Sequence, residues 1–246
     1  CLTGSYHGET LGTLGVSDVE LYKEAYGPLM RQAMTVPSPD ARQAEPGETA
    51  ADVAQRAAAG VEAVLAAHHA SVAALIVEPL VQGAGGMVMY DPEYLQLACA
   101  LCDRYNVHLI ADEIMVGFGR TGTLFAHEQA DIRPDFLCLS KGLTGGYLPL
   151  SVVLTTDAVY AAFYDDALTR GFLHSHSYTG NPLACRAALA TLDLFAEEAV
   201  LERNRQFAER FTELLTPLAK HRRARHFRHC GMIWAVDIAT DDPEFR

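Results

Sequence analysis

Four short apolar runs, each bounded by polar or turn residues, recur through the middle of the chain and predict buried strands. They are AALIV (73–77), VHLIAD (107–112), DFLCLS (135–140) and SVVL (151–154). Between the first two runs, segment 93–105 has apolar side chains at helical spacing, and Asp91-Pro92 before it is typical of a helix start. This alternation of strand, helix and strand predicts an α/β fold with a mostly parallel sheet and helices on both faces.

Further helices are predicted on either side of this central part. The Ala-rich segment 49–69 carries its apolar residues on one face, and segment 157–163 predicts a short helix. A long helical region begins at Asn181-Pro182, and its first part is apolar almost all round, which predicts burial. From Val200 the pattern becomes amphipathic, and Pro217 is expected to end this helix.

The remaining segments suggest the domain organisation. Residues 9–48 show little periodicity and contain several prolines, so we expect an excursion over the surface, whereas CGMIWAVDI (230–238) predicts a strand. We expect a large domain over residues 1–217 and the beginning of a small C-terminal α+β domain over residues 218–246. Neither end of the sequence resembles a natural terminus, so we expect a fragment that lacks both ends of a longer protein.

Composition and charge narrow the class of function. The formal net charge is −12, and the one basic cluster, HRRARHFR (221–228), is short, which argues against nucleic-acid binding and favours a solvated connection. No apolar run is long enough to span a membrane, and the N-terminus does not resemble a signal peptide. We therefore expect a cytoplasmic protein that binds neither nucleic acid nor membrane.

The cysteines and histidines do not predict a metal site. Cys99 and Cys102 form a CxxC pair, but they share a helical stripe with Leu95 and Ala98, and no second pair completes a ligand set. We expect buried helical thiols instead, and nothing in the cysteine pattern requires an oxidising compartment.

The segment GFGRTG (117–122) matches the glycine pattern of a dinucleotide-binding loop. That motif needs a helix directly after it, whereas TLFAHEQADIRP is a poor helix opening. We expect a flexible loop near a site rather than a nicotinamide-binding turn.

Asp112 and Lys141 follow two neighbouring predicted strands. The carboxyl ends of parallel strands are the usual place for a ligand in such sheets, so both side chains are candidates for one site. From these residues alone, Lys141 is either a structural strand end or a desolvated amine with a lowered pKa.

Several segments together resemble the class III, or ω-type, aminotransferases, which are pyridoxal 5′-phosphate enzymes of fold type I. The matching segments are YHGET, VEPLVQGAGG, LIADEIMVGFGRTGTLFAHE, PDFLCLSKGLTGG and SYTGNPLAC, and they span most of the chain. The resemblance implies the large domain of that fold and an aminotransferase activity in a homodimer with shared active sites.

The resemblance also implies roles for the two strand-end residues. The lysine that matches Lys141 bonds to the cofactor aldehyde and, once substrate displaces it, carries the proton between substrate and cofactor. The aspartate that matches Asp112 pairs with the pyridinium nitrogen and keeps the ring protonated, so that it can absorb carbanion charge.

Other matching residues are expected around the same cofactor. Tyr6 is expected against the ring, with His7 beside it, and Gln82 near the 3′-oxygen. Ser177 is expected at the phosphate, contributed by the other subunit of the dimer. Glu78 either orients neighbouring polar groups or is a structural strand-end carboxylate.

The resemblance implies three positions for substrate binding. Tyr6 and Lys141 are two of them, and both also belong to the cofactor site. The third expectation is a glycine at position 176, whose equivalent in this chain is left open.

Two details suggest a substrate. Many members that act on ornithine, acetylornithine or 4-aminobutyrate have GEGG where this chain has Gly83-Ala84-Gly85-Gly86, and GAGGM with LTGGYLPLSVVLTT resembles the biotin-pathway branch. That branch aminates 8-amino-7-oxononanoate to 7,8-diaminononanoate, usually with S-adenosylmethionine as the donor. The segment HSYTGN (176–181) also resembles lysine-using members, so the donor is open between these two.

Two alternatives remain at this point. One is another class III aminotransferase that acts on an ω-amino acid or a polyamine. The other, of a different class, is a non-catalytic fragment that retains the fold.

Overall fold

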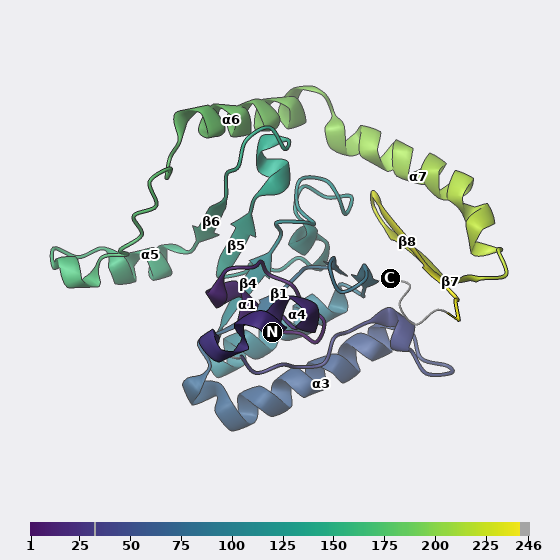
Figure 1. The fold of residues 1–246 in the computed structure, drawn as a ribbon, viewed down its shortest axis with the longest axis horizontal. Helices are drawn as coiled ribbons and strands as arrows, with labels where there is room; N and C mark the ends of the chain where they lie inside the picture. Colours follow the sequence, from purple (N-terminus) through teal and green to yellow (C-terminus); the bar gives the residue numbers. More distant parts are fainter. Residues whose placement is uncertain (32, 242–246) are drawn as a thin grey trace.

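A four-stranded sheet forms the centre of the computed structural model, which describes residues 1–31 and 33–241 (Figure 1). Its strands are β1 (Ala74–Val77), β4 (His108–Asp112), β5 (Phe136–Leu139) and β6 (Val152–Thr155), in the order β1-β4-β5-β6. The first three are mutually parallel and β6 is antiparallel to β5. The predicted mostly parallel α/β sheet is therefore confirmed.

The two faces of this sheet are covered to different degrees. The side chains that point to one face are buried, namely Leu75, Val77, Leu109, Ala111, Leu137 and Leu139. Their neighbours in sequence on the opposite face, such as Ile76 and Ile110, are only partly buried. The prediction that 73–77 is a fully buried strand is thus wrong for every second residue, because the described residues cover only one face closely.

Helices α3 (Ala50–His68) and α4 (Glu93–Tyr105) pack against each other and supply a large part of the main core. α3 begins with a capping box in which Thr49 and Asp52 each bind the other's backbone N–H, and α4 ends at Asn106 in the left-handed conformation. Both helices were predicted within two residues of their bounds. Cys102 on α4 is buried, as expected, whereas Cys99 is only partly buried, and all six cysteines are free.

The glycine segment 117–122 is a loop, as predicted. Phe118, Gly119 and Gly122 have positive φ, and the next regular element is the short 3-10 helix η4 (Ala126–Ala130) rather than an α-helix. The dinucleotide-binding turn is therefore absent from this part of the structure.

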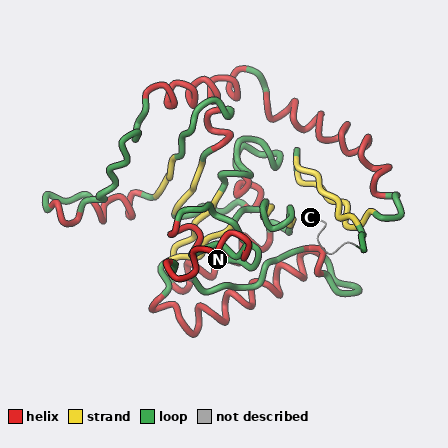
Figure 2. Tube along the Cα trace, in the orientation of Figure 1, coloured by secondary structure: helices red, strands yellow, loops and turns green. Residues whose placement is uncertain are grey.

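The N-terminal part of the chain contains only short elements (Figure 2). These are α1 (Leu11–Leu14), α2 (Glu20–Lys23), η1 (Glu24–Leu29) and η2 (Ala41–Gln43), with η3 (His69–Ser71) after α3. At the start of the chain, a single bridge joins Leu2 to Val36. The predicted surface excursion is confirmed in outline, although Leu14 and Val36 are buried.

From β6 onwards the chain forms an arm, which we define as residues 152–219. In Figure 1 its helices follow the outside of the sheet. It contains α5 (Asp157–Phe163), η6 (Leu168–Arg170), α6 (Pro182–Glu197) and α7 (Val200–Ala219). The prediction that the start of α6 is buried is wrong: only Ala184 and Ala188 of this helix are buried, and Leu183 is 70% exposed. Pro217 also does not end α7; a proline in the last turn removes only one helical hydrogen bond, and the helix continues to Ala219.

The C-terminal part is a β-hairpin of β7 (Ala224–Cys230) and β8 (Ile233–Ile238). The single strand predicted over 230–238 is therefore two strand ends and a turn, with Gly231 at φ +55. The basic cluster is not merely a solvated connection, because its second half forms β7. The boundary at 217/218 stays a prediction, and residues 242–246 lie outside the described residues.

Neither a membrane-spanning helix nor a metal-ligand cluster is found among the described residues. No helix among them is both long and apolar enough to cross a membrane. No group of three or more histidine, cysteine, aspartate or glutamate residues there is arranged to hold a metal ion.

Candidate active site

Polar side chains gather where β1, β4 and β5 end. Glu78 follows β1, Asp112 ends β4, and Lys141 comes two residues after β5, at the start of η5 (Lys141–Thr144). Because these strands are parallel, their carboxyl ends lie along one edge of the sheet. The expected placement of Asp112 and Lys141 on the same edge is thus confirmed by the topology.

Asp112 is buried and bound by two groups. Its Oδ2 lies 2.8 Å from Nδ1 of His7, and its Oδ1 accepts a hydrogen bond of 3.2 Å from the Ile114 N–H. His7 is buried as well, and its N–H donates to Ser17 Oγ. The other ring nitrogen, Nε2, is buried without a hydrogen-bond partner among the described residues. Such an atom costs free energy unless a group outside the chain binds it.

Glu78 joins two loops at this edge. Its carboxylate accepts from the Tyr6 N–H at 3.0 Å and from the Gly83 N–H at 2.9 Å. Burial raises the pKa of Glu78, and nearby Asp112 adds to the rise, while the two N–H donors and His7 oppose it. The structure therefore favours an orienting role, since this carboxylate fixes both the Tyr6–His7 segment and the loop of residues 83–87, which we call the glycine loop.

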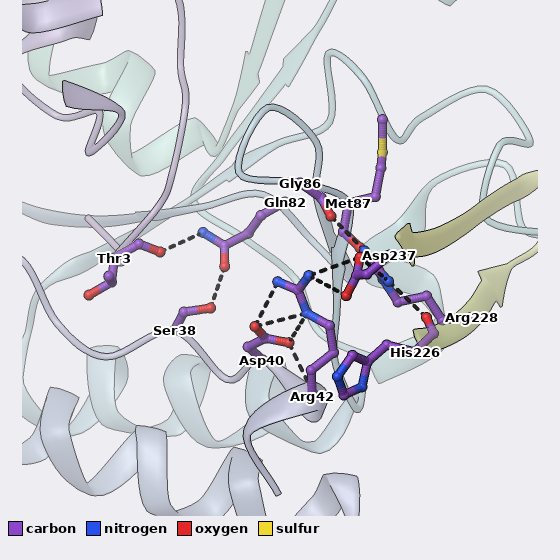
Figure 3. A network of polar contacts seen from close by, with 10 residues as sticks. All are labelled: Thr3, Ser38, Asp40, Arg42, Gln82, Gly86, Met87, His226, Arg228 and Asp237. Carbon is purple, nitrogen blue, oxygen red and sulfur yellow. Dashed lines mark hydrogen bonds and ion pairs between the residues drawn. The ribbon is translucent and has the colours of Figure 1, made fainter. Parts of the chain in front are cut away.

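Gln82 holds the same N-terminal segment from another side, as Figure 3 shows. It lies on β2 (Val81–Gln82), which pairs with β3 (Val88–Met89), and it is fully buried. Its Oε1 accepts a hydrogen bond from Ser38, and its Nε2 donates to the Thr3 carbonyl at 3.1 Å. Gln82, Glu78 and Asp112 thus bind consecutive parts of the segment from Thr3 to His7.

Lys141 lies apart from this cluster. It has a φ of +43°, a conformation that is uncommon for a residue with a side chain and is often found at functional sites. No ion pair or hydrogen bond joins it to Asp112 within the part of the chain that the structure describes. Tyr6 packs its ring against Tyr22 and donates to Glu9.

Lys141 instead lines a cleft of about 410 Å³ between the sheet edge and the C-terminal hairpin. The other lining residues are Met87, Ile114, Met115, Gly117, Arg120, Gly142, Met232, Ile233 and Trp234. The walls are largely apolar and rich in methionine, while Arg120 and Lys141 add positive charge. Such a lining suits a flexible aliphatic ligand with an acidic group.

Ser177 is not brought to this site in the single chain. It is exposed on the loop between α5 and α6. Its expected contribution to another subunit stays a prediction.

The glycine expected at position 176 for substrate binding is wrong, because the residue there is His176. His176 is exposed on the same loop as Ser177, and its Nδ1 accepts a hydrogen bond of 3.3 Å from the Tyr178 N–H. A glycine would leave room for a ligand to approach the backbone, whereas an imidazole ring occupies that space. Position 176 is also absent from the lining of the cleft that contains Lys141.

Sequence reasoning gave no role to several residues that shape the site. Glu113 is fully buried and accepts from the N–H groups of Ala126 and His127 and from the His127 ring, so it fixes the loop after GFGRTG. Its position beside Asp112 was the available signal. Arg120, Met87 and Trp234 line the cleft, but only tertiary structure brings these distant positions together.

The comparisons with known proteins agree with this geometry. The family model described as aminotransferase class-III matches residues 1–245. The chain belongs to the class-III aminotransferases.

Curated relatives in this family carry one recurring name. The chain is 46% identical to the adenosylmethionine-8-amino-7-oxononanoate aminotransferase of Helicobacter pylori over 99% of this chain and 55% of that protein. It is 41% identical to the protein of the same name from Nitratidesulfovibrio vulgaris, over 97% of this chain and 44% of that protein. The chain thus spans about half the length of the curated relatives it matches.

Solved structures show the same fold. The adenosylmethionine-8-amino-7-oxononanoate aminotransferase of Methanocaldococcus jannaschii matches with a TM-score of 0.88 and 31% identity, over 98% of this chain and 53% of that one. An (S)-enantioselective ω-transaminase from Thermomicrobium roseum matches with a TM-score of 0.89 and 31% identity, over 96% and 52%. The fold type I expectation is therefore confirmed.

Class-III aminotransferases depend on pyridoxal 5′-phosphate, and the residues of this chain fit that group. The cofactor carries an aldehyde, a ring nitrogen and an aromatic face, and this edge of the sheet offers an amine, a buried carboxylate and a tyrosine. The unpartnered Nε2 of buried His7 is the observation that most directly favours a bound polar group.

Proposed function

We propose that the whole protein transfers an amino group to 8-amino-7-oxononanoate, forming 7,8-diaminononanoate in biotin biosynthesis, with pyridoxal 5′-phosphate as cofactor. The observation that carries this proposal is the identity of 46% to the Helicobacter pylori relative across 99% of the chain. The five relatives with 39% to 46% identity share its name.

In this proposal Asp112 holds the cofactor at its ring nitrogen. When bound, the cofactor supplies an electron-poor ring that stabilises negative charge on the substrate carbon. A buried carboxylate opposite the ring nitrogen favours the protonated ring, because the attraction is stronger where water is excluded. The His7 bond fixes the orientation of Asp112, and Gln82 and Tyr6 complete the surroundings of the ring.

Lys141 is the residue that we assign to covalent attachment and proton transfer. With the cofactor bound, this amine would hold it covalently and, once freed by substrate, would accept and return the proton that the reaction moves. The place of Lys141 in the lining of the cleft supports this role, because an amine or ketone that enters the cleft would meet it. Proton transfer by a positioned side chain contributes about 10²–10⁴-fold to a rate.

The cleft supports the choice of acceptor. 8-Amino-7-oxononanoate is an aliphatic chain that ends in a carboxylate, and the cleft combines apolar methionine walls with the cationic side chains of Arg120 and Lys141. Ala84 stands where many ornithine- or 4-aminobutyrate-using members have a glutamate, which also favours the biotin-pathway branch.

The donor, the assembly and the compartment belong to the same proposal. S-adenosylmethionine is the favoured donor because the relatives are named for it, and lysine is the second candidate because of the HSYTGN segment. A cytoplasmic homodimer in which Ser177 reaches the partner's site fits the exposed position of the arm.

A donor and acceptor panel on the whole protein tests this function. The panel combines S-adenosylmethionine, lysine and ornithine as donors with 8-amino-7-oxononanoate, 2-oxoglutarate and succinic semialdehyde as acceptors. We expect 7,8-diaminononanoate with one of the first two donors. Turnover only with another acceptor would support the ω-amino acid alternative, and no turnover with any pair would support the non-catalytic one.

A further inference from the structure

Arg228 on β7 binds the backbone of the glycine loop that precedes the cleft (Figure 3). Its Nη2 donates to the Gly86 carbonyl at 2.7 Å, and its Nε donates to the Met87 carbonyl at 2.8 Å. The two partners are consecutive in the chain and lie about 140 positions before the arginine. One guanidinium therefore fixes the direction of two successive peptide groups.

The remaining donors of Arg228 bind its own hairpin. Nη1 donates to the His226 carbonyl at 2.8 Å and to Asp237 Oδ1 at 2.9 Å. The side chain of Arg228 is only 12% exposed, and its bond to Asp237 is partly buried. Arginine suits this position because its planar fork presents several donors in fixed directions.

Asp237 extends the network to a third part of the chain. Its Oδ2 accepts from Arg42 at 3.3 Å, and Arg42 forms a close bidentate pair with the buried Asp40 beside η2. The hairpin is thus bound both to the glycine loop and to the segment before α3. Figure 3 shows Arg228 and Asp237 between these two attachments.

The loop that Arg228 binds has a conformation that requires support. Gly86 has a φ of +97° and Met87 a φ of +52°, and a non-glycine residue rarely adopts the left-handed region unless its surroundings impose it. The N–H groups of Gly86 and Met87 both donate to the Gly83 carbonyl inside the loop, and their own carbonyls accept from Arg228. The side chain of Met87 then lines the cleft.

The same hairpin supplies the neighbouring wall of the cleft. Met232, Ile233 and Trp234 line it, and the Met232 N–H donates to the Arg120 carbonyl at 2.8 Å. Part of the cleft wall is therefore built from two segments, the glycine loop and the hairpin, and the side chain of Arg228 joins them.

We propose that Arg228 is a positioning residue that sets acceptor affinity, because it joins the Gly86–Met87 backbone to the β7–β8 hairpin and so fixes the Met87 and Trp234 wall of the cleft. Arg228 does not itself line the cleft, so it acts through Met87. The part that concerns acceptor affinity rests on the proposed function.

The first test compares Arg228→Met, Arg228→Lys and the control Arg225→Met in the whole protein. Arg225 is exposed on the same strand, and among the described residues its guanidinium binds only carbonyls of its own hairpin and the preceding turn. The control therefore makes the same change in charge without touching the glycine loop. We expect Arg228→Met to raise the acceptor KM by about tenfold or more with a much smaller change in kcat. Arg228→Lys should lie between, since lysine keeps the charge but cannot span both carbonyls and Asp237.

A double-mutant cycle with Met87→Ala tests the route of the effect. If Arg228 acts through Met87, the rise in KM for Arg228→Met combined with Met87→Ala is well below the product of the single effects. Fully multiplicative effects would overturn the proposal. An acceptor KM that stays close to that of Arg225→Met, or a fall in kcat with KM unchanged, would also overturn it.

Hydrogen–deuterium exchange separates this proposal from the proposed function. We expect faster exchange of the peptide that contains residues 83–89 in Arg228→Met and Arg228→Lys but not in Arg225→Met, whatever acceptor the enzyme uses. Unchanged exchange there would show that Arg228 does not fix the glycine loop, and would overturn the proposal. If 8-amino-7-oxononanoate is not aminated but exchange responds as expected, the proposed function fails, and the KM comparison is made with the acceptor that the panel identifies.

Discussion

The edge of the sheet and the arm both carry many apolar side chains, but these are mostly buried at the sheet edge and mostly exposed on the arm. Around β4 large apolar residues such as Leu109 and Val116 are buried, and polar ones such as Glu78, Gln82 and Glu113 are bound by named partners. Of residues 152–219, all described by the structure, only Ala184 and Ala188 are buried. Leucines and aromatic residues cover the outside of α5, α6 and α7 and the loop between α5 and α6.

At the sheet edge a single chain buries its own apolar side chains, whereas on the arm it leaves them exposed. An apolar surface of this extent is rare on a monomer and usually marks an interaction surface. The polar groups at the sheet edge are bound within the chain itself, whereas Ser177 lies on an arm whose apolar side chains are exposed. The experiments below test this contrast, from the largest expected effect to the smallest.

Lys141→Ala should abolish turnover in the sheet-edge site. Loss of proton transfer alone lowers the rate by about 10²–10⁴-fold, and loss of the covalent attachment adds to it. Steady-state turnover and the visible absorption of the cofactor after borohydride treatment measure the two losses. Retained turnover or cofactor fixed to the variant would remove Lys141 from this role.

Leu95→Ala and Leu194→Ala compare the two regions by stability. Leu95 is fully buried on α4, so its truncation should lower the free energy of unfolding by about 2–5 kcal/mol. Leu194 on α6 is 49% exposed, and its truncation should cost far less in dilute protein. Denaturant titration at several protein concentrations measures both.

The loss of stability caused by Leu194→Ala is compared across protein concentrations with the loss caused by Leu95→Ala. A loss that changes with concentration for Leu194→Ala alone would show that a second subunit covers the arm. Equal and concentration-independent losses in the two variants would contradict the contrast between the regions.

Ser177→Ala tests whether the arm completes a site in another subunit. Loss of one hydrogen bond to a charged phosphate corresponds to about 1.5–3 kcal/mol, or roughly 10–100-fold in cofactor affinity. Hybrid dimers of Ser177→Ala with Lys141→Ala should regain one intact site, because each chain supplies what the other lacks.

Cofactor titration and turnover of the mixture measure that recovery. A mixture whose turnover equals the average of the two parents would place Ser177 in the site of its own chain, or in none.

Glu78→Gln should change how stability depends on pH. Burial raises the pKa of Glu78 above 4.5, so the folded state holds its proton more tightly than the unfolded state. Between pH 4.5 and the higher folded pKa, the wild-type free energy of unfolding therefore falls as pH rises. The glutamine side chain of the variant cannot ionise, so this contribution should disappear, although one N–H loses its acceptor.

Urea titrations across this pH range provide the measurement. Glu209→Gln, at an exposed position of α7, is the matched control. A slope in Glu78→Gln that equals the wild-type slope would show that this carboxylate is not the source.

The sequence by itself determined the elements and the chemistry of the site. Apolar runs and capping signals placed β1, β4, β5, α3 and α4 to within two residues, because these are local properties of the chain. The segments around Asp112 and Lys141 led to the correct family through their resemblance to known members.

Tertiary structure decided which surfaces are covered and which distant groups meet. The composition of α6 predicted burial, but its leucines face outwards, because burial depends on what packs against a helix and not on its own pattern. The pairing of β7 with β8 and the Arg228 network joining residues 40, 86, 87 and 237 had no local signal either, although a strand was predicted over 230–238. Such contacts depend on how the strands and loops are brought together in space, and spacing along the chain does not encode that directly.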